Sequence, residues 1–387
     1  MADGPAPLSL TLHRRIAEIR AADWDACAGA DNPFVSHAFL SALEDSGSAV
    51  PERGWLPQHA ALRDEAGTLL ACAPCYAKSH SQGEYVFDHS WADAMERAGG
   101  RYYPKLQVCV PFSPVPGPRL LIRPGAEVPP GALAQALVQG CQAVGASSVH
   151  ATFCTADEWT ALGEAGWLQR LGTQFHWTNP GYGCFDDFLG GLASRKRKVL
   201  KRERRDVQAS GLVLRCLRGA EITERHWDAF NRFYRSTTDK KWGRSAYLTK
   251  RFWPMLGDRL GDAVVLMVAE RDGVPVAGAL NLVGRDAIYG RNWGATVDVP
   301  FLHFELCYYM AMDFAIAQGI GRVEAGAQGE HKIQRGYLPV PTYSAHWIAH
   351  RGLSDAVADF LARERPAMLR EMEMLATLSP FRQAGDA

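Results

Sequence analysis

The chain has 387 residues, of which 47% are hydrophobic and 22% are charged. At roughly 100–200 residues per domain, this length predicts two domains. The abundant apolar and aromatic residues exclude disordered, collagen-like and coiled-coil proteins. The 42 Lys and Arg residues balance the 42 Asp and Glu residues, so the net charge gives no reason to expect a nucleic-acid or membrane partner for the whole molecule. Any role for charge must be local to a segment.

The cysteines and the first residues of the chain indicate its compartment. Nine cysteines, an odd number, lie mostly in apolar runs, where a free thiol packs as a small hydrophobic group. Cys72 and Cys75 form a close pair, but no second pair lies at zinc-ligand spacing, so we expect no metal site. Neither a secretion signal nor an apolar run long enough to cross a membrane is visible in the sequence. We therefore expect a soluble, cytoplasmic protein.

In chain order, the sequence predicts the same series of elements twice. The first series is a β-hairpin over residues 58–76, a helix over 128–144 and a strand over 148–153. The second series is a hairpin over residues 266–282 with Asp272-Gly273 as its turn, a long apolar helix over 299–317 and a strand over 322–325. Proline near the start and glycine at the end of each helix are where helix geometry favours them. The repeated order predicts an internal duplication.

Each half therefore reads as a mixed α/β unit, and the predicted fold class is α/β with mixed sheets. Turn-forming and aromatic residues mix over residues 170–185, which places the boundary there. We assign an N-terminal domain to residues 1–175 and a C-terminal domain to residues 176–387. The second domain begins with a basic helix and ends with a closing helix over residues 353–376. Motifs of nucleophile-elbow hydrolases, phosphate-loop enzymes and zinc proteases are missing from the sequence.

Segment 195–206 is unusual, because eight of its twelve residues are basic. On a helix, Lys198, Arg202 and Arg205 fall on one face, while neighbouring apolar residues can pack inward. A solvated helical face is one interpretation. Contact with phosphates or a polyanion is the other, because neighbouring cations repel one another unless an anion is close. The candidate phosphate-binding residues are Arg195, Arg197 and Lys198.

A loop rich in glycine and titratable residues follows the last predicted strand, over residues 324–336. Loops beyond the carboxyl ends of strands form many sites in α/β folds, and three glycines permit a ligand to approach closely. His331 is the side chain best suited to take a proton near neutral pH. A polar surface turn is the alternative interpretation. The candidates are His331, Glu324 and Glu330 as catalytic residues, with Lys332 and Arg335 as anion-binding residues.

Three further segments combine aromatic and polar residues. Residues 102–118 carry prolines at positions 111, 114, 116 and 118, which remove backbone donors, and form either a rigid aromatic wall with one cation or an irregular edge strand. Residues 175–179 and 291–295 each place an indole beside polar groups near a predicted strand end; core or turn positions are the alternative. The candidate binding residues here are Lys105, Trp177, Asn179, Arg291 and Trp293. In the long apolar helix, Glu305 and Asp313 need partners if they are buried.

Together these segments resemble a bacterial family, the FemAB-like predicted N-acyltransferases of the GNAT superfamily, associated with peptidoglycan biosynthesis or recognition. The resemblance covers residues 32–347, and Tyr308 lies within it as a candidate substrate-binding residue. It implies two tandem GNAT-like folds with a cleft between them. The resemblance is carried by Tyr102-Tyr-Pro-Lys-Leu-Gln with Val110-Pro-Phe-Ser-Pro-Val-Pro-Gly-Pro-Arg, Phe175-His-Trp-Thr-Asn, Ser194-Arg-Lys-Arg-Lys, Phe304-Glu-Leu-Cys-Tyr-Tyr and Glu324-Ala-Gly-Ala-Gln-Gly-Glu-His-Lys.

The resemblance implies the transfer of an acyl group to an amine. In the better-known Fem transferases the donor is an aminoacyl-tRNA and the acceptor is a peptidoglycan precursor, and the basic segment here looks like the start of their second domain. Acyl-CoA is the other donor of the superfamily, bound by an Arg/Gln-x-x-Gly-x-Gly/Ala loop. Residues 291–296 depart from that pattern at Thr296. Aminoacyl-tRNA and acyl-CoA both stay open as donors, and a tRNA is among the implied partners.

The leading hypothesis is an N-acyltransferase that joins an activated acyl or aminoacyl group to a primary amine, with its site in the cleft between the halves. The amine must lose a proton to attack, and the oxyanion that forms needs hydrogen-bond donors. We expect His331 or Glu324 to be the base. The competing hypothesis is a non-catalytic GNAT-like protein that binds a cell-wall precursor or an RNA.

Overall fold

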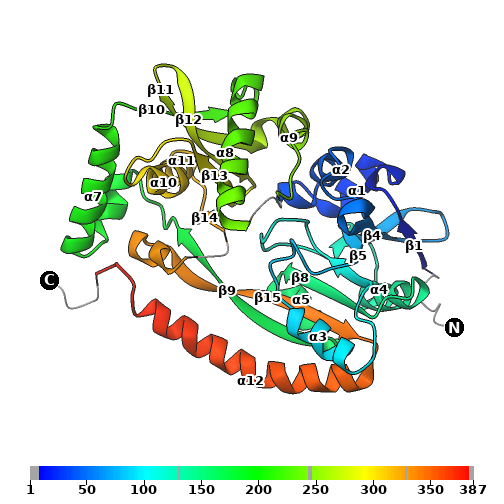
Figure 1. Cartoon of the computed structure of the whole chain (residues 1–387). Helices are drawn as coiled ribbons and strands as arrows, with labels where there is room; N and C mark the ends of the chain where they lie inside the picture. Colours follow the sequence, from blue (N-terminus) through cyan, green and yellow to red (C-terminus); the bar gives the residue numbers. More distant parts are fainter. Residues whose placement is uncertain (1–7, 130, 243–245, 327–328, 383–387) are drawn as a thin grey trace. The chain divides into compact units, whose positions relative to one another are not determined.

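The structure is a computed structural model that describes residues 8–129, 131–242, 246–326 and 329–382. The chain divides into two compact units, and Figure 1 labels their elements. Unit 1 is Met1–Gly172 with Pro341–Arg370, and unit 2 is Thr173–Val340 with Glu371–Ala387. A single boundary near residue 175 would place residues 341–370 with the second unit. They lie in unit 1 instead, because strand β15 pairs with strand β8 of that unit.

Unit 1 is built from two groups of hydrogen-bonded strands. The first is a four-stranded antiparallel sheet of order β1-β3-β4-β7, and the second group has the order β15-β8-β6-β5-β2. The strands are β1 (Ser9–His13), β2 (Trp55–Pro57), β3 (His59–Arg63), β4 (Leu69–Ala73), β5 (Cys75–Lys78), β6 (Lys105–Val108), β7 (Leu121–Ile122), β8 (Ser148–Cys154) and β15 (Leu338–Ile348). Its helices are α1 (Ala21–Ala28), α2 (His37–Asp45), α3 (His89–Arg97), α4 (Ala132–Ala143), α5 (Ala156–Glu164) and most of α12 (Arg351–Ala376).

Unit 2 contains a group of strands in the order β10-β11-β12-β13-β14-β9. These are β9 (Leu168–Thr178), β10 (Val213–Arg218), β11 (Val264–Arg271), β12 (Val274–Val283), β13 (Ala287–Ala295) and β14 (Arg322–Glu324). The helices are α6 (Phe185–Gly190), α7 (Ser194–Gln208), α8 (Glu224–Trp242), α9 (Phe252–Leu260), α10 (Leu302–Phe304) and α11 (Met310–Ala317). A π-helical turn, Glu305–Tyr309, joins α10 to α11, and a 3₁₀ helix, Glu330–Arg335, follows β14.

The two units repeat one connection, which confirms the predicted mixed α/β fold class. In unit 1, β6 pairs in parallel with β8, and α4 lies between them in the chain. In unit 2, β13 pairs in parallel with β14, and α10 to α11 lie between them. Parallel neighbours need such a helical crossover, whereas the hairpins β3–β4 and β11–β12 are antiparallel. The other strand pairs described in each unit are antiparallel.

Turn and cap chemistry explains why these elements end where they do. The β11–β12 hairpin turns at Asp272 and Gly273, which have φ of 52° and 73°, so the turn has the left-handed backbone that an Asp-Gly pair favours. Helix α11 ends before Gly319, whose φ is 66°, and the Ile320 amide donates to the Ala315 carbonyl across this cap. Helix α4 begins at Ala132, later than the predicted start at residue 128.

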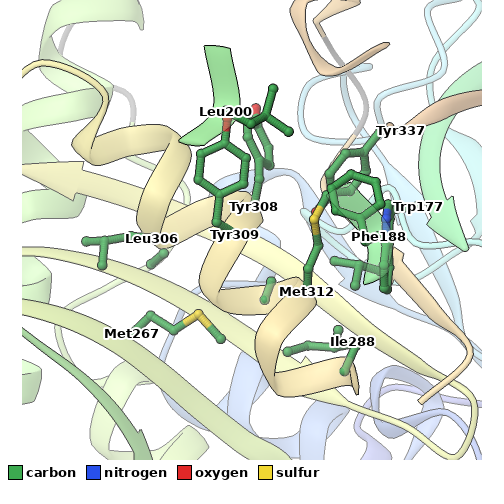
Figure 2. Close-up of a cluster of buried hydrophobic side chains, with 14 of the residues drawn as sticks. Trp177, Phe188, Leu200, Met267, Ile288, Leu306, Tyr308, Tyr309, Met312 and Tyr337 are labelled. Atoms are coloured by element: carbon green, nitrogen blue, oxygen red, sulfur yellow. The ribbon is translucent and has the colours of Figure 1, made fainter. Parts of the chain in front are cut away.

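A continuous apolar cluster fills unit 2 (Figure 2). Trp177 of β9 and Phe188 of α6 pack edge to face, with ring centroids 5.8 Å apart. Leu306 and Met312 bring the π-helical turn and α11 into the same cluster, and Leu200 brings in α7. Because α7 has an apolar side that reaches this core, its basic residues are confined to the remaining faces.

Unit 1 contains a buried histidine pair. His150 on β8 and His346 on β15 face each other with their Nδ1 atoms 2.8 Å apart. The Ser148 hydroxyl lies 2.8 Å from His150 Nε2, and Trp91 packs edge-on against the His346 ring. Burial lowers the pKa of His150 to about 3 and lowers that of His346 well below its usual value. Both imidazoles are therefore neutral in the folded protein at neutral pH.

This pair makes the stability of the fold sensitive to acid. Below pH 6.5 these two histidines bind protons in the unfolded chain that they exclude in the folded chain, so their contribution to the free energy of unfolding is constant above that pH and falls below it. Each buried histidine contributes a slope of about 1.4 kcal/mol per pH unit. In urea denaturation between pH 7.5 and 5, we expect His346→Gln to reduce the slope by about one histidine's share. The exposed His89→Gln is the control, and an equal slope in both variants would contradict the interpretation.

Candidate functional site

The predicted glycine-rich loop follows β14 in unit 2 and leads into the 3₁₀ helix Glu330–Arg335. Gly326, Gly329 and Gly336 have φ of 79°, 113° and 86°, so each occupies a conformation that L side chains rarely adopt. A Cβ added to Gly329 would lie 2.4 Å from the His331 ring. The glycines therefore shape the loop around its own side chains. Residues 327 and 328 and the side chain of the predicted catalytic residue Glu330 lie outside the described structure.

His331 is the exposed titratable side chain of this loop, and it is bonded to a tyrosine. A hydrogen bond of 2.9 Å joins His331 Nε2 to the hydroxyl of Tyr308, which comes from the π-helical turn. Tyr308 is 3% exposed, and burial raises its pKa. The phenol thus stays protonated at neutral pH and can donate to a neutral imidazole. Both residues were predicted from the sequence as site residues, but the contact between them was not predicted.

Aromatic rings surround the pair. His303 packs against Tyr308 and His331 with ring centroids 5.4 and 6.3 Å away, and Phe304 lies 5.9 Å from His331. The Arg335 guanidinium stacks 3.3 Å above the Phe304 ring, and its Nη1 donates to the His331 carbonyl over 2.9 Å. Arg335 thus holds the backbone of His331 through a planar, stacked contact.

A carboxylate of α7 anchors this arrangement. Glu203 accepts a 2.8 Å hydrogen bond from Arg335 Nη2 and another from the Tyr309 hydroxyl. Glu203 and Arg335 are both nearly buried, so the pair is weakly screened. Next to it, Arg204 donates to Glu305 over 2.8 Å and also bonds Asp313. Glu305 is buried and Asp313 half-buried, so Arg204 is the partner that the sequence analysis required for them.

Glu324 ends β14 and lies inside the unit, only 3% exposed. Its Oε1 accepts a 2.8 Å hydrogen bond from Arg322 Nε, and its Oε2 lies 3.8 Å from His176 Nε2 without a hydrogen-bond partner. Burial raises the pKa of Glu324 to about 7, against the attraction of Arg322. Burial also lowers the pKa of His176 to about 3. This carboxyl group can change its proton near neutral pH, but it is not exposed.

Lys332 is a second buried titratable group of the loop. It is 2% exposed, and its Nζ donates to the Gly326 carbonyl over 2.8 Å. Burial lowers its pKa to about 8. The lysine therefore fixes the backbone of the loop at Gly326. A ligand reaches the exposed imidazole of His331 before it reaches this buried ammonium group.

Helix α7 carries two kinds of cation. Its inward residues Leu200 and Val207 are buried as predicted. Lys196 donates to Gln334, and Lys201 lies 3.1 Å from Asp186. No side-chain partner within the described ranges is found for the cations on its outer side: Arg195, Arg197, Lys198 and Arg202. Three of these, Arg195, Lys198 and Arg202, line an open groove of about 520 Å³ with Ser194 and Val199.

Three residues that the sequence predicted to bind a ligand stabilise the fold instead. Trp177 is fully buried in the unit 2 core, so a ligand cannot reach it. Asn179 Oδ1 accepts from the amides of Gly181 and Tyr182, and its amide group donates to the Ile320 carbonyl, which fixes the turn after β9. Lys105 is buried in unit 1, where its ammonium group bonds Glu84 over 2.7 Å and also bonds Asp88 and Ser81. Residues 102–118 therefore do not present Lys105 to a ligand as the cation of an aromatic wall, which was the first of the two interpretations of this segment.

Segment 291–296 is mostly strand rather than loop. Residues through Ala295 pair with β12, and the Thr296 amide donates to the Val276 carbonyl over 2.8 Å. Arg291 is half-buried and contributes to the electrostatic environment of Glu324. Trp293 is half-buried, packs against His303 at 5.1 Å, and lines an open pocket of about 670 Å³. This segment thus offers a pocket beside the His331 cluster.

Two features bear on other kinds of site. Among the residues that the structure describes, no group of three or more His, Cys, Asp and Glu side chains is placed to hold a metal ion. Within the same residues, no helix has both the length and the apolarity to span a bilayer.

Comparison with known proteins identifies the relatives of this architecture. Residues 15–383 match the model of the FemAB-like family, described as peptidoglycan biosynthesis/recognition. No curated protein matches the chain. FemX shares 11% identity at a TM-score of 0.54, over 88% of this chain and 98% of that chain. The C-terminal domain of a putative lysylphosphatidylglycerol synthetase from Agrobacterium fabrum shares 12% identity at 0.52, over 89% and 96%. At these identities the structures show a shared fold.

Two arginines of α7, the paired Arg204 and the unpaired Arg202, should differ in their effect on stability. Arg204→Leu leaves the buried Glu305 carboxylate without its cation, so we expect a loss of roughly 3–5 kcal/mol in the free energy of unfolding. Arg202→Leu removes an exposed, unpaired cation and should change it by less than about 0.5 kcal/mol. Urea denaturation measures both. Restoring stability with Arg204→Leu/Glu305→Leu would confirm the cause, and equal effects of the single variants would contradict it.

Proposed function

The chain belongs to the FemAB-like family, and on that premise we propose that it transfers an activated acyl group to a primary amine, with His331 as the base. The observation that carries this proposal is the exposed imidazole of His331 bonded to the buried, protonated Tyr308 over 2.9 Å. A base must contact the proton it removes, and an imidazole titrates near neutral pH. FemX, which shares the fold, supports the choice of reaction class.

The proposed reaction requires one proton acceptor and one stabiliser of negative charge. The amine attacks the acyl carbon, a C–N bond forms, and the nitrogen loses a proton to His331. The bond from the acyl carbon to the oxygen or sulfur of the donor then breaks, and the leaving atom takes the proton back from His331. In the tautomer that acts as a base, His331 Nε2–H donates to the Tyr308 oxygen and Nδ1 takes the proton, while the Tyr308 hydroxyl, kept protonated by burial, is a donor for the oxyanion. Arg335 acts as a positioning residue, because it holds the His331 carbonyl.

Glu324 is the other base that the sequence predicts, and the structure favours His331 over it. The pKa of Glu324, about 7, suits proton transfer. However, the carboxylate is 3% exposed and bonded to Arg322, so an amine has no direct access to it. We propose that the proton on Glu324 sets the net charge of the buried groups behind the loop, beside His176. In this proposal Glu324 does not contact the substrate.

The outer face of α7 supports a phosphate-bearing donor or acceptor. Arg195, Lys198 and Arg202 line one groove, and no anion of the described chain neutralises them. The Thr296 amide, in the segment that resembles a CoA-binding loop, already donates to Val276. These two observations favour an aminoacyl-tRNA over acyl-CoA as the donor. They also fit the alternative of a non-catalytic protein that binds an RNA or a cell-wall precursor.

Removal of the base tests the reaction. With donor and amine mixtures analysed by mass spectrometry, the unmodified protein should form an acylated amine. His331→Ala should lower the rate by roughly 10²–10⁴-fold, the range for a lost general base. Tyr308→Phe should lower it less, because the imidazole stays in place. His89→Ala, an exposed histidine of unit 1, is the control. Full activity of His331→Ala would overturn the assignment. If His331→Ala and the control His89→Ala lose the product equally, the loss has a cause other than the missing base.

Neutralisation of the α7 face tests the phosphate contact. Arg195→Gln/Lys198→Gln/Arg202→Gln should weaken binding of a tRNA and reduce the slope of log affinity against log salt by about 2–3, because each phosphate contact contributes roughly 0.7–0.9. Fluorescence anisotropy between 50 and 300 mM salt measures the slope. The control Arg351→Gln/Arg363→Gln/Arg370→Gln removes the same charge from exposed positions of α12. If both triple variants change the slope alike, α7 has no specific role.

A further inference from the structure

The pocket of about 670 Å³ in unit 2 lies where the end of β13 meets helix α8. Ser236 and Thr237 of α8 line one side, and Trp293, Thr296 and Asp298 line the other. The two elements approach closely at Gly294, where an added Cβ would lie 2.1 Å from the Phe233 carbonyl oxygen. Backbone therefore contacts backbone beneath the pocket, and a side chain at residue 294 would force α8 away.

The lining of this pocket suits a cation. Asp298 is an exposed carboxylate for which the described chain offers no ion-pair partner. Trp293 supplies an aromatic ring, the type of side chain that attracts ammonium groups best. Ser236, Thr237 and Thr296 add hydroxyl oxygens that can accept hydrogen bonds. None of the described lining residues is Lys, Arg or His.

A short series of ring contacts connects the pocket with the proposed base. The Trp293 ring lies 5.1 Å from His303, and His303 lies 6.3 Å from His331. His303 thus contacts both the Trp293 ring and the His331 ring. A ligand that joins the pocket to His331 would span these ring contacts.

The position of Asp298 decides which group of the acceptor binds here. An ammonium beside a carboxylate keeps its proton and is not a nucleophile. The nitrogen that attacks the acyl group must instead be neutral and in contact with His331. One acceptor satisfies both conditions when it has two cationic or basic groups separated by a short chain.

We propose that the pocket lined by Trp293 and Asp298 binds the second, non-reacting cationic group of a diamino acceptor, whose other amine reaches His331. This inference rests on the proposed function and names the acceptor class of the same site. The carboxylate and the indole hold the charged end, and the hydroxyls of α8 orient it. A monoamine whose ammonium group fills the pocket has no second amine to reach His331.

Calorimetric titration of the full chain with 1,5-diaminopentane and with 1,5-pentanediol, which has a similar length and no charge, tests this. The diamine should bind at least about tenfold more tightly than the diol, since only the diamine makes a charge-assisted contact. Asp298→Asn should abolish that preference, and Trp293→Leu should reduce it. Asp258→Asn removes the same charge from an exposed position on α9 and should preserve it. In the acyl-transfer assay, 1-aminopentane, which cannot fill the pocket and contact His331 at once, should react more slowly than the diamine. Equal binding of diamine and diol, or an unchanged preference in Asp298→Asn, would overturn the inference.

A failure of the pocket assignment can be distinguished from a failure of the proposed function. If acyl transfer to monoamines proceeds and depends on His331, while the diamine gains nothing from Asp298, the pocket assignment fails and the reaction stands. If the diamine binds through Asp298 but neither amine is acylated with any donor, the pocket assignment stands and the transferase proposal fails.

Discussion

The Glu203 carboxylate is the contact on which the arrangement of unit 2 depends. It accepts hydrogen bonds from Arg335 and Tyr309, so one buried anion fastens α7 to the 3₁₀ helix and to the π-helical turn. Arg335 then holds the His331 carbonyl, and the residue preceding Tyr309 bonds the His331 ring. Removing such a buried charge leaves its partner unpaired, which costs far more than a surface ion pair contributes. Glu203 therefore sets the position of His331, the proposed base, which it does not contact.

This constraint also explains the basic run that is so conspicuous in the sequence. Two adjacent residues of α7, Glu203 and Arg204, point toward the unit and are fully paired, whereas the outer cations of the helix have no described partner. A helix that is tied down by internal ion pairs and by Leu200 and Val207 can present a row of like charges without fraying. The repulsion among those charges is thus offset inside the same helix.

Sequence reasoning found the elements and only part of the site, for physical reasons. Hairpins, cap glycines and the amphipathic face of α7 are local patterns, so Asp272-Gly273 and Gly319 place their turns correctly. Pairing between distant segments has no local signal. Lys105 looks like an accessible cation until Glu84 and Asp88 fold around it, and Trp177 looks like a binding residue until the core covers it. The role of Glu203 was not predicted, because an acidic residue within a basic run looks like part of a solvated helical face.

The duplication makes the difference between the units informative. Unit 1 encloses two of its titratable clusters: Lys105 is paired with two carboxylates, and the histidine pair is neutral and buried. Charges satisfied in this way add to a folded structure but have no capacity left for a ligand. Unit 2 repeats the β–helix–β connection, yet its exposed groups include His331, the outer cations of α7 and Asp298. Because chemistry needs groups that the fold does not itself satisfy, the proposed reaction and the proposed binding sites both use these residues of unit 2.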